Sequence, residues 1–442
     1  MDDNEVIRHQ EFCQLRSAIR GSDRHLIIGI DVAKEKHHAF MGTATGKSLL
    51  RKLVFENNLD GFRKLLIHAE AVKVKHALSK SVFGVEPTGN YHKPLGAYLI
   101  DRGYDLVFVS GEAAKKNRVL LTGRWDKNDT KCAANIADLI SQGKCLFYDR
   151  PCAGITELRS LLSLRKRLKK EEHSLRMRIR NSLLAVHFPE MDRFFGSSLS
   201  ENLSLVYWCL DPRKIAEMDF ARFFELVTTR ERGIAQYRRL RAIWEQAADS
   251  IGCRVERASE LEAQLLVEKV FKVQKEIKEV NEWIKDASRE FDEFQLLLTI
   301  PGFGPYIASV VLAVIADPLR FDNEKQVLKL AGYDLCAKRS GKNSAKARPV
   351  ISKKGNATLR YGLYQAALVA SSRNVHFIEY FTNTLRGRER ELGIKTKMRV
   401  KLAAKMLVIA WTLMKKKETF NAEYLKPENR IQIHSLQPRA TT

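Results

Sequence analysis

The residues with the clearest chemical meaning are two carboxylates that each end an apolar segment. Asp31 follows the run 26–30, which is rich in β-branched residues, and Glu86 closes the segment 81–85 in the same way. A buried charge without a partner is so unfavourable that such a group normally pairs, neutralises or binds a metal. If the two segments are neighbouring strands, their carboxylates meet at one edge of a sheet, where paired oxygen ligands suit Mg²⁺.

A third acidic contribution comes from the stretch WDKNDTKC, in which positions 126, 129 and 132 step by three residues. Residues at this spacing lie near one another on one face of a helix. Asp126 and Asp129 are therefore candidate ligands for the same metal ion. Each carboxylate alone can equally be a strand-end or turn residue that makes local hydrogen bonds, but the three features in this order favour a hard-cation site.

A candidate nucleophile lies in segment 337–361, which contains eight basic and no acidic side chains and is therefore suited to bind phosphates. A serine hydroxyl is a weak nucleophile until a base or an electropositive setting activates it. Ser340 stands beside Gly341, among cations that could stabilise an attacked phosphate. Ser344 and Ser352 compete with it, and each can equally be an ordinary loop serine. The basic residues expected to contact nucleic acid are Lys338, Arg339, Lys342, Lys353, Lys354 and Arg360.

The acidic groups require a sheet to position them, and residues 25–150 carry the pattern of one. Strand and helix signals alternate, with strands expected at 26–32, 37–43, 48–55, 81–87 and 104–110 and helices at 59–72, 91–103 and 129–143. Three hairpin-like strands followed by a βαβα order are typical of an RNase H-like domain. We therefore expect an α/β fold here, preceded by an N-terminal leader of residues 1–24.

The middle of the chain, residues 151–292, is charged and helical and carries a heptad pattern near its end. Its apolar positions are spaced 4,3,4,3,4,3,4, at Leu266, Val270, Val273, Ile277, Val280, Ile284, Ala287 and Phe291. This spacing is the a/d seam of a coiled coil, which we interpret as the contact of a homo-oligomer, a dimer or tetramer. Packing within the chain's own helical bundle gives a similar stripe and is the alternative.

The C-terminal region, residues 293–425, is predicted to be helical. Its stretch TIPGFGPY follows the helix-hairpin-helix pattern, in which Gly302 and Gly304 allow a tight turn that presents backbone N–H groups to a DNA phosphate. A glycine-rich loop between two core helices is the alternative. Two further helices and a flexible tail, residues 426–442, are expected to follow. The fold class of the whole chain is thus α/β plus all-α.

The balance of charge points to the partner. Lys and Arg outnumber Asp and Glu by 76 to 52 in 442 residues, which gives a formal net charge of +24. This excess favours nucleic acid as the partner; a basic protein without such a partner is the alternative.

Seven cysteines without a C-x-x-C pair suit a reducing cytosol better than a disulfide framework or a zinc site. No apolar run approaches the roughly 20 residues of a membrane span, so we expect a cytoplasmic protein with no membrane partner.

Two blocks of the sequence resemble one known family. The segments IGIDVAKEKHHAF, FGVEPTGNYHKPLGAYL and KNDTKCAANIADLI are similar to the acidic motifs of the DEDD transposases of the insertion-sequence-110 family and of their pilin-gene invertase relatives. The segments LLTIPGFGPYIASVVLAVIADPLRFDN, LAGYDLCAKRSGK and ISKKGNATLRYGLYQAAL are similar to that family's C-terminal transposase domain. The resemblance covers most of 25–150 and 293–410, with both blocks in the family's order.

The resemblance implies roles for individual residues. Asp31 and Glu86 match the first two acids of a RuvC-like tetrad that holds Mg²⁺. In the third motif, one alignment makes Asp129 the third acid and puts Cys132 where the fourth should be, although a soft thiol is a poor ligand for Mg²⁺. The other alignment pairs Asp126 with Asp129 but loses the downstream match. We favour the first alignment, which would make this copy a weakened, inactivated or altered enzyme.

The resemblance also implies a reaction and its partners. Ser340 would attack a DNA phosphate and form a phosphoserine link, and attack by another strand's end would complete the exchange. A structured guide RNA would pair with donor and target DNA, which suits a chain without an obvious base-reading motif. The protein would work at the nucleoid in the bacterial cytoplasm. The alternatives are a Mg²⁺-dependent RNase H-like nuclease that uses water and a catalytically inactive protein that only binds nucleic acid.

Overall fold

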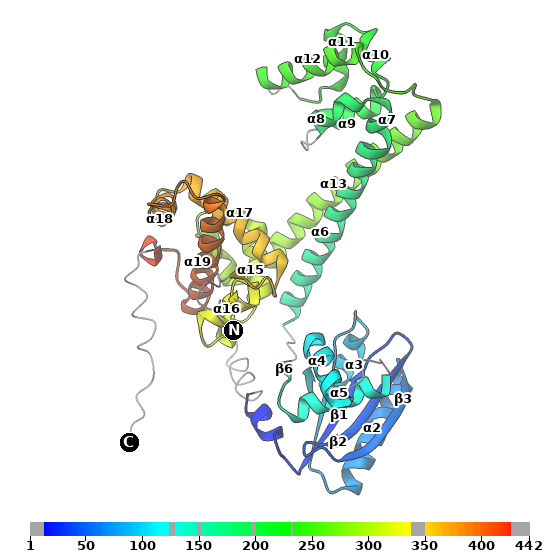
Figure 1. Ribbon diagram of the computed structural model, residues 1–442, viewed down its shortest axis with the longest axis vertical. Coiled ribbons are helices and arrows are strands. Elements are labelled where there is room, and N and C mark those ends of the chain that lie inside the picture. The colour runs from blue at the N-terminus through cyan, green and yellow to red at the C-terminus, as the bar shows by residue number, and fades with distance from the viewer. Residues whose placement is uncertain are drawn as a thin grey trace, which may run out of the picture. The chain divides into compact units, whose positions relative to one another are not determined.

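The computed structural model describes residues 13–122, 129–147, 152–195, 200–230, 233–336 and 350–425. These residues fall into two compact units, one extending to Arg150 and one beginning at Pro151 (Figure 1). The first unit is a mixed sheet with helices, and the second is largely helical. No helix in this described part of the chain is both long and apolar enough to cross a membrane.

The first unit is built on one mixed sheet. Its strands are β1 (His25–Asp31), β2 (Lys36–Thr43), β3 (Ser48–Glu56), β4 (Lys80–Val85), β5 (Asp105–Phe108) and β6 (Leu146–Phe147), arranged in the order β3-β2-β1-β4-β5-β6. β1 pairs antiparallel with β2 and parallel with β4, and β5 continues the parallel part. The strands from β1 to β5 match the predicted ones. The expected α/β architecture is confirmed, and it is consistent with an RNase H-like fold.

Helices cover both faces of this sheet. They are α2 (Leu59–Lys75), α3 (His92–Ile100), α4 (Gly111–Thr122) and α5 (Asp129–Ser141). α2 and α3 pack on the face that carries Leu26, Ile28 and Ile30, because the side chains of a strand alternate between faces. α4 and α5 pack on the opposite face, which carries Ile27 and Gly29. The sequence predicted α2, α3 and α5 but not α4.

A short N-terminal helix, residues 13–19, adds to the layer of α5. Ile19 is fully buried in the core that α5 covers. Arg16 donates from Nε to the Gly143 carbonyl oxygen, just past the end of α5, at 3.0 Å. Cations near the last carbonyls of a helix are favourable. The described part of the segment interpreted as a leader thus belongs to the folded unit.

Two long helices form an antiparallel pair in the second unit. α6 (Ala153–Arg178) and α13 (Arg257–Arg289) lie side by side (Figure 1). Arg165 donates to the Asn281 side chain at 2.6 Å, and Gln274 donates to Glu172 at 2.9 Å. Residue numbers therefore rise along one helix as they fall along the other.

The heptad seam of α13 is buried within the chain. Six of its positions are at most 5% exposed: Leu266, Val270, Val273, Ile277, Val280 and Ile284. Their partners are α6 and the helical cores at the two ends of the pair. The structure therefore corrects the interpretation of this seam as the contact of a homo-oligomer. The heptad periodicity indicated a stripe that is indeed buried, and α6 of the same chain is the helix that buries it.

Residues 179–256 connect the two long helices and fold into a helical subdomain. Its elements are η1 (Ile179–Leu184), α7 (Ala185–His187), η2 (Pro189–Met191), α8 (Asp192–Phe195), α9 (Ser200–Trp208), α10 (Pro212–Ala216), α11 (Phe220–Val227) and α12 (Ile234–Ala248). Phe223 and Ile243 are fully buried and pack with Leu266 and Val270 of α13 in a separate core. The subdomain is thus attached to the far end of the antiparallel pair.

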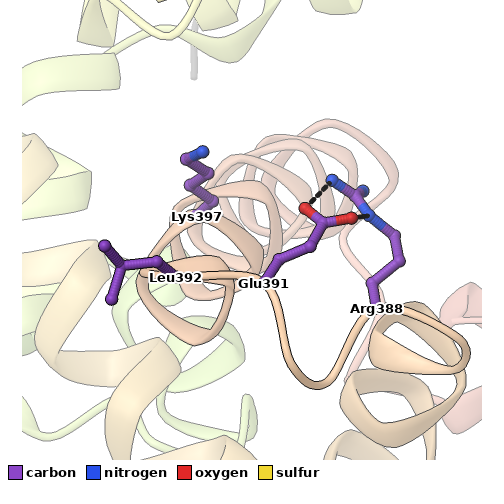
Figure 2. A pocket seen from close by; sticks show the side chains of 4 residues that line it. All are labelled: Arg388, Glu391, Leu392 and Lys397. Atoms are coloured by element: carbon purple, nitrogen blue, oxygen red, sulfur yellow. Dashed lines mark hydrogen bonds and ion pairs between the residues drawn. The ribbon is translucent and has the colours of Figure 1, made fainter.

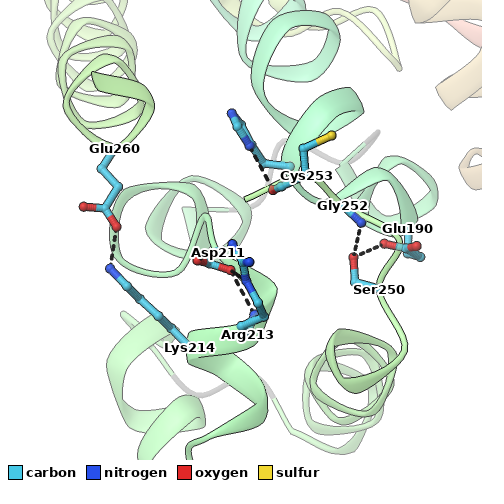
Figure 3. A network of polar contacts seen from close by, with 9 residues as sticks. Glu190, Asp211, Arg213, Lys214, Ser250, Gly252, Cys253 and Glu260 are labelled. Atoms are coloured by element: carbon cyan, nitrogen blue, oxygen red, sulfur yellow. Dashed lines mark hydrogen bonds and ion pairs between the residues drawn. The ribbon is translucent and has the colours of Figure 1, made fainter. Parts of the chain in front are cut away.

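Polar contacts fix the loop that leads from this subdomain into α13 (Figure 3). Glu190 accepts hydrogen bonds from the Ser250 hydroxyl at 2.7 Å and from the Ile251 backbone N–H at 3.1 Å. Burial raises the pKa of Glu190, but these hydrogen bonds outweigh it and hold the pKa below its ordinary value. A ring nitrogen of His187 contacts the Cys253 carbonyl oxygen at 3.2 Å. The loop is therefore an ordered connection.

The C-terminal helices share a core with the near end of the long pair. Their elements are α14 (Asp292–Leu298), α15 (Pro305–Ile315), η3 (Pro318–Arg320), α16 (Glu324–Ala331), β7 (Leu335–Cys336), β8 (Val350–Ile351), α17 (Ala357–Arg373), α18 (Val375–Leu385), α19 (Ile394–Lys416) and η5 (Ala422–Leu425). Val311, Leu363 and Leu407 are buried together with Leu158 of α6 and Ile284 of α13. One core therefore spans α6, the end of α13 and the C-terminal helices.

Truncation of a seam side chain tests this packing. Ile277→Ala removes a side chain that is 5% exposed, and we expect the free energy of unfolding to fall by about 2–5 kcal/mol. The loss should not depend on protein concentration, because the partner helix belongs to the same chain. Denaturant unfolding at two protein concentrations measures the loss of unfolding free energy and its dependence on protein concentration. Leu265→Ala, at a 48% exposed position of α13, is the control; a loss that grows on dilution would mean that a second chain buries the seam.

Candidate active site

Asp31 and Glu86 lie at the carboxyl ends of two neighbouring parallel strands. β1 and β4 pair in register up to Ile30 opposite Val85, and each carboxylate is the next residue along its strand. On the other side of β4, its pairing with β5 extends past Phe108, because the Val109 backbone N–H donates to the Val85 carbonyl oxygen at 3.0 Å. Both carboxylate residues are half-buried. The structure thus brings these two predicted residues to one edge of the sheet.

Both carboxylates lie on the face of the sheet that α5 covers. Side chains alternate along a strand, so Asp31 shares the face of Gly29. A Cβ placed on Gly29 would lie 2.2 Å from the Ala133 carbonyl oxygen of α5, so no larger residue fits there. Glu86 lies two residues past Gly84, whose Cβ would also collide with α5. Gly29 therefore lets the backbone of the helix lie close against β1, while Gly84 leaves space for the Ile140 side chain of α5.

The immediate surroundings of the two carboxylates come from α4 and β2. A Cβ placed on Gly111, the first residue of α4, would lie 2.9 Å from Glu86 Oε1, so this glycine leaves room for the carboxylate. Asp31 lies opposite His38 in the antiparallel ladder with β2. Sequence reasoning did not single out His38. The sequence feature that could have identified His38 is that it is a polar residue in β2, the strand that pairs with the strand of Asp31.

The third acidic motif reaches the same face through α5. Asp129 is the first residue of this helix, one turn before Ala133, which touches β1. The side chain of Asp129 and all of Asp126 lie outside the described residues. Among the side chains that are described, no three His, Cys, Asp or Glu lie close enough to hold a metal ion. The carboxylate oxygens of Asp31 and Glu86 are donors that Mg²⁺ prefers, but they need a further ligand to complete the set.

A buried polar network fixes α4 against α5. Asn117 donates from Nδ2 to Asn135 Oδ1 at 2.9 Å and to Asp138 Oδ2 at 2.7 Å. Asn135, which is 1% exposed, donates to the Ala114 carbonyl oxygen at 2.7 Å. A satisfied buried network specifies one arrangement of the elements that it joins. The helix that begins at Asp129 is therefore held in a defined place beside the helix that contacts Glu86.

A short hairpin closes the base of the segment that contains Ser340. β7 and β8 pair antiparallel on either side of it, while Ser340, Lys338, Arg339 and Lys342 themselves lie outside the described residues. The competing Ser352 donates its hydroxyl to Asp334 Oδ1 at 2.5 Å, and its backbone N–H donates to the Asp334 carbonyl oxygen at 2.8 Å. Ser352 therefore fastens the hairpin, and its hydroxyl is engaged there.

Three predicted phosphate-binding cations follow this hairpin. Lys353 and Lys354 are exposed, as a contact with nucleic acid requires. Arg360 donates from Nη1 to the carbonyl oxygens of Ala331 at 2.8 Å and Gly355 at 3.1 Å. The last carbonyls of a helix lack partners within the helix, and Ala331 is the last residue of α16. Arg360 thus joins the end of α16 to the start of α17, a structural role that sequence reasoning did not foresee.

The two glycines of the helix-hairpin-helix pattern lie between α14 and α15. Gly302 has a φ of +91°, and a Cβ on it would lie 2.5 Å from the Ala366 carbonyl oxygen of α17. The fold itself therefore requires a glycine at this position. Gly304 is exposed with open space around it, and it precedes α15 without a side-chain cap. Gly304 is thus the position of this turn that a phosphate could approach.

Comparison with known proteins identifies the family. Residues 28–189 match the model of the DEDD transposases of insertion sequence 110, described as a transposase, and residues 294–382 match the model described as "Transposase IS116/IS110/IS902 family". The chain belongs to the insertion-sequence-110 family of DEDD transposases. It is 24% identical over 405 residues to the insertion element IS116 uncharacterized 44.8 kDa protein of Streptomyces clavuligerus, covering 90% of this chain and 97% of that protein. It is therefore an enzyme of DNA transposition, and DNA is its partner.

Cys132 is the residue of the third acidic motif on which the two predicted alignments differ. The residue lies in α5 and is 2% exposed. In the alignment that we favour, it stands where the family has its fourth acid. A thiol adds no hard ligand for Mg²⁺, but it also avoids the cost of burying a further carboxylate when no cation is bound. The alignment through Asp126 stays open, since that residue lies outside the described ones.

Replacement of Cys132 separates the two alignments. If position 132 belongs to the acidic tetrad, Cys132→Asp should raise Mg²⁺-dependent cleavage of DNA from the element's ends. In EDTA the same variant should lose about 1–3 kcal/mol of unfolding free energy, because a buried unpaired carboxylate is costly, and Mg²⁺ should restore part of it. Cleavage assays and denaturant unfolding with and without Mg²⁺ measure both effects. Cys132→Asn, similar in size and uncharged, should gain no activity; no gain with Asp would assign the fourth acid elsewhere.

Proposed function

We propose that this transposase cuts and rejoins DNA through a serine–DNA covalent intermediate at a Mg²⁺-dependent site, directed by a structured RNA. The observation that carries the proposal is the register of β1 and β4, which sets Asp31 and Glu86 side by side at the carboxyl ends of parallel strands. Asp129, at the start of α5, is the proposed third ligand. When bound, Mg²⁺ offsets negative charge on the scissile phosphate and favours ionisation of an attacking hydroxyl.

Ser340 is the proposed nucleophile. Its oxygen attacks the phosphorus of the scissile phosphodiester, and its proton passes to a nearby base. The bond from phosphorus to the leaving strand's oxygen breaks, and that oxygen takes up a proton. One phosphoester replaces another, so the energy of the bond is kept in the phosphoserine link. Attack by the hydroxyl end of another strand reverses the step and releases Ser340, with no external energy source.

The basic residues around Ser340 are proposed to hold the DNA backbone in this reaction. Lys338, Arg339 and Lys342 flank the serine, and the exposed Lys353 and Lys354 adjoin the hairpin at the base of its segment. Contacts to phosphates position a duplex but carry no sequence information. We therefore assign the choice of target to a structured RNA that pairs with donor and target DNA.

A homo-oligomer is also part of the proposal, with a contact surface other than the seam of α13. The seam is buried against the same chain, whereas Phe271 and Trp283 on this helix are 41% and 53% exposed. Large apolar side chains at exposed positions are suited to a contact with a second copy. Light scattering of the wild type and of a Phe271→Ser, Trp283→Ser variant measures whether these residues hold copies together.

Cys132 favours a second candidate, a transposase relative that binds DNA but cleaves it weakly or not at all. Its buried thiol removes one hard ligand from the favoured tetrad. Retained DNA binding without Mg²⁺-dependent cleavage in the wild type would support this candidate. Recovery of cleavage in Cys132→Asp would identify the missing carboxylate as the cause.

Detection of a protein–DNA adduct tests the serine mechanism. Protein purified with its bound nucleic acid is incubated with Mg²⁺ and end-labelled DNA from the element's ends, then denatured. We expect label on the protein that survives denaturation and is lost on proteolysis. Ser340→Ala should abolish the adduct, as should Asp31→Asn and Glu86→Gln, while all three variants still bind DNA. Ser344→Ala, in the same basic segment, is the matched control and should keep it. Cleavage without any adduct would instead mean that water is the nucleophile.

Sequencing of co-purified nucleic acid tests the proposed guide. The protein is purified from cells that carry its native flanking DNA and is washed at moderate salt before the bound RNA and DNA are sequenced. We expect one discrete RNA that maps beside the gene and contains stretches complementary to donor and target. Heterogeneous nucleic acid that is lost steeply with salt would mean non-specific phosphate binding, and would contradict RNA guidance without contradicting the serine chemistry.

A further inference from the structure

The loop between α18 and α19, residues 386–393, exposes a large apolar side chain in an unusual setting. Leu392 is 97% exposed, more than any other large apolar residue in the described part of the chain. The loop lies outside both segments that match the family models, 28–189 and 294–382. Single exposed leucines are common and need no explanation by themselves. The backbone of the loop and the charges around Leu392 indicate that this leucine has a role in binding.

The backbone of this loop is held in one conformation. Leu385 and Ile394, at its two ends, are 8% and 2% exposed and belong to the C-terminal core. Three successive backbone hydrogen bonds of 2.8, 3.1 and 3.2 Å connect them, each spanning three residues. Arg388 adds a two-pronged ion pair to Glu391, at 2.8 and 2.9 Å. Figure 2 shows the Leu392 side chain pointing away from this ion pair. The leucine is therefore presented by a preformed loop.

The charge around Leu392 is strongly positive. Residues 386–401 contain seven basic and two acidic side chains. Arg390, Lys395 and Lys397 are exposed, and none of them has an ion-pair partner among the described residues. A hollow of about 580 Å³ lies between the ion pair, Leu392 and Lys397 (Figure 2). An apolar tip surrounded by unpaired cations suits a polyanion that offers apolar surface between its charges.

We propose that Leu392 is a wedge that enters duplex DNA between two neighbouring base pairs, while Arg390, Lys395 and Lys397 contact the flanking phosphates. Apolar side chains inserted in this way unstack one base step at a cost of roughly a few kcal/mol and kink the duplex. Phosphate contacts offset that cost. A protein partner fits less well, because protein interfaces are depleted in lysine and place apolar residues in larger patches. The inference needs DNA as the partner, which the family supplies, and it does not depend on serine chemistry.

Local unstacking of DNA is the direct test. The full-length protein, with its bound RNA, is mixed in EDTA with duplexes from the element's ends that carry 2-aminopurine at successive positions, a base whose fluorescence rises when it unstacks. Outside any stretch that pairs with the bound RNA, we expect a several-fold rise at one position or two adjacent ones. At saturating protein, Leu392→Ala should abolish the rise, and its DNA affinity should fall by no more than about tenfold, since phosphate contacts remain. Lys397→Gln should lower the slope of log affinity against log salt by about one.

Two controls keep the outcome specific. Ile251→Ala removes another highly exposed side chain, 83% exposed on the helical subdomain, and should leave the fluorescence rise unchanged. Ser340→Ala should also retain the full rise, because unstacking precedes any chemistry. Unstacking by Leu392→Ala equal to that of the wild type would overturn the proposal, as would a rise seen only with 2-aminopurine in a structured RNA. A missing adduct in the serine assay would leave this result unaffected, so the two proposals fail separately.

Discussion

The close contact between α5 and β1 is the constraint on which the candidate active site depends. The helix lies so near the strand that the Ala133 carbonyl oxygen occupies the space of a side chain at position 29, and only glycine leaves that space open. Asp31 is two residues further along the same face, and Asp129 is one turn earlier in the same helix. One backbone contact thus sets the spacing between the first and third acidic motifs, whereas Gly84, on the strand that leads to Glu86, faces only the tip of the Ile140 side chain of α5. A glycine in a buried strand costs stability, and here the close approach of a helix explains its presence.

The antiparallel pair of α6 and α13 organises the second unit in a comparable way. One end of the pair is built into the core of the C-terminal helices, and the other end is built into the core of the subdomain 179–256. Between the two cores the helices are held by their apolar seam and by polar contacts such as Arg165 to Asn281. A long helix pair with a separate core at each end is a spacer, so the subdomain is carried at a defined distance along the pair from the C-terminal helices.

The sequence predicted most elements of the first unit because their signals are local. Apolar, β-branched runs that end in a turn mark β1 and β4, and an amphipathic stretch marks α2. The segment of α4 is as amphipathic as that of α2, but the place of this helix in the fold is fixed by contacts that are distant in sequence, such as Asn117 with Asn135. The seam of α13 shows the same limit, since heptad spacing reveals that a stripe is buried but not which helix buries it. Arg360 and Ser352 bind backbone and side-chain atoms that only the folded chain brings near them.

Two basic segments of the second unit are flanked by backbone that hydrogen bonds hold in place. The described residues on either side of the segment that contains Ser340 form the β7–β8 pair, which the hydrogen bond from the Ser352 hydroxyl to Asp334 fastens. The loop that presents Leu392 is tied at Leu385 and Ile394. A loop fixed at its ends loses less conformational entropy when it binds, so more of the favourable free energy of each phosphate contact contributes to affinity. Cations concentrated on such loops can hold the DNA backbone firmly, because contacts to phosphates position a duplex without reading its sequence.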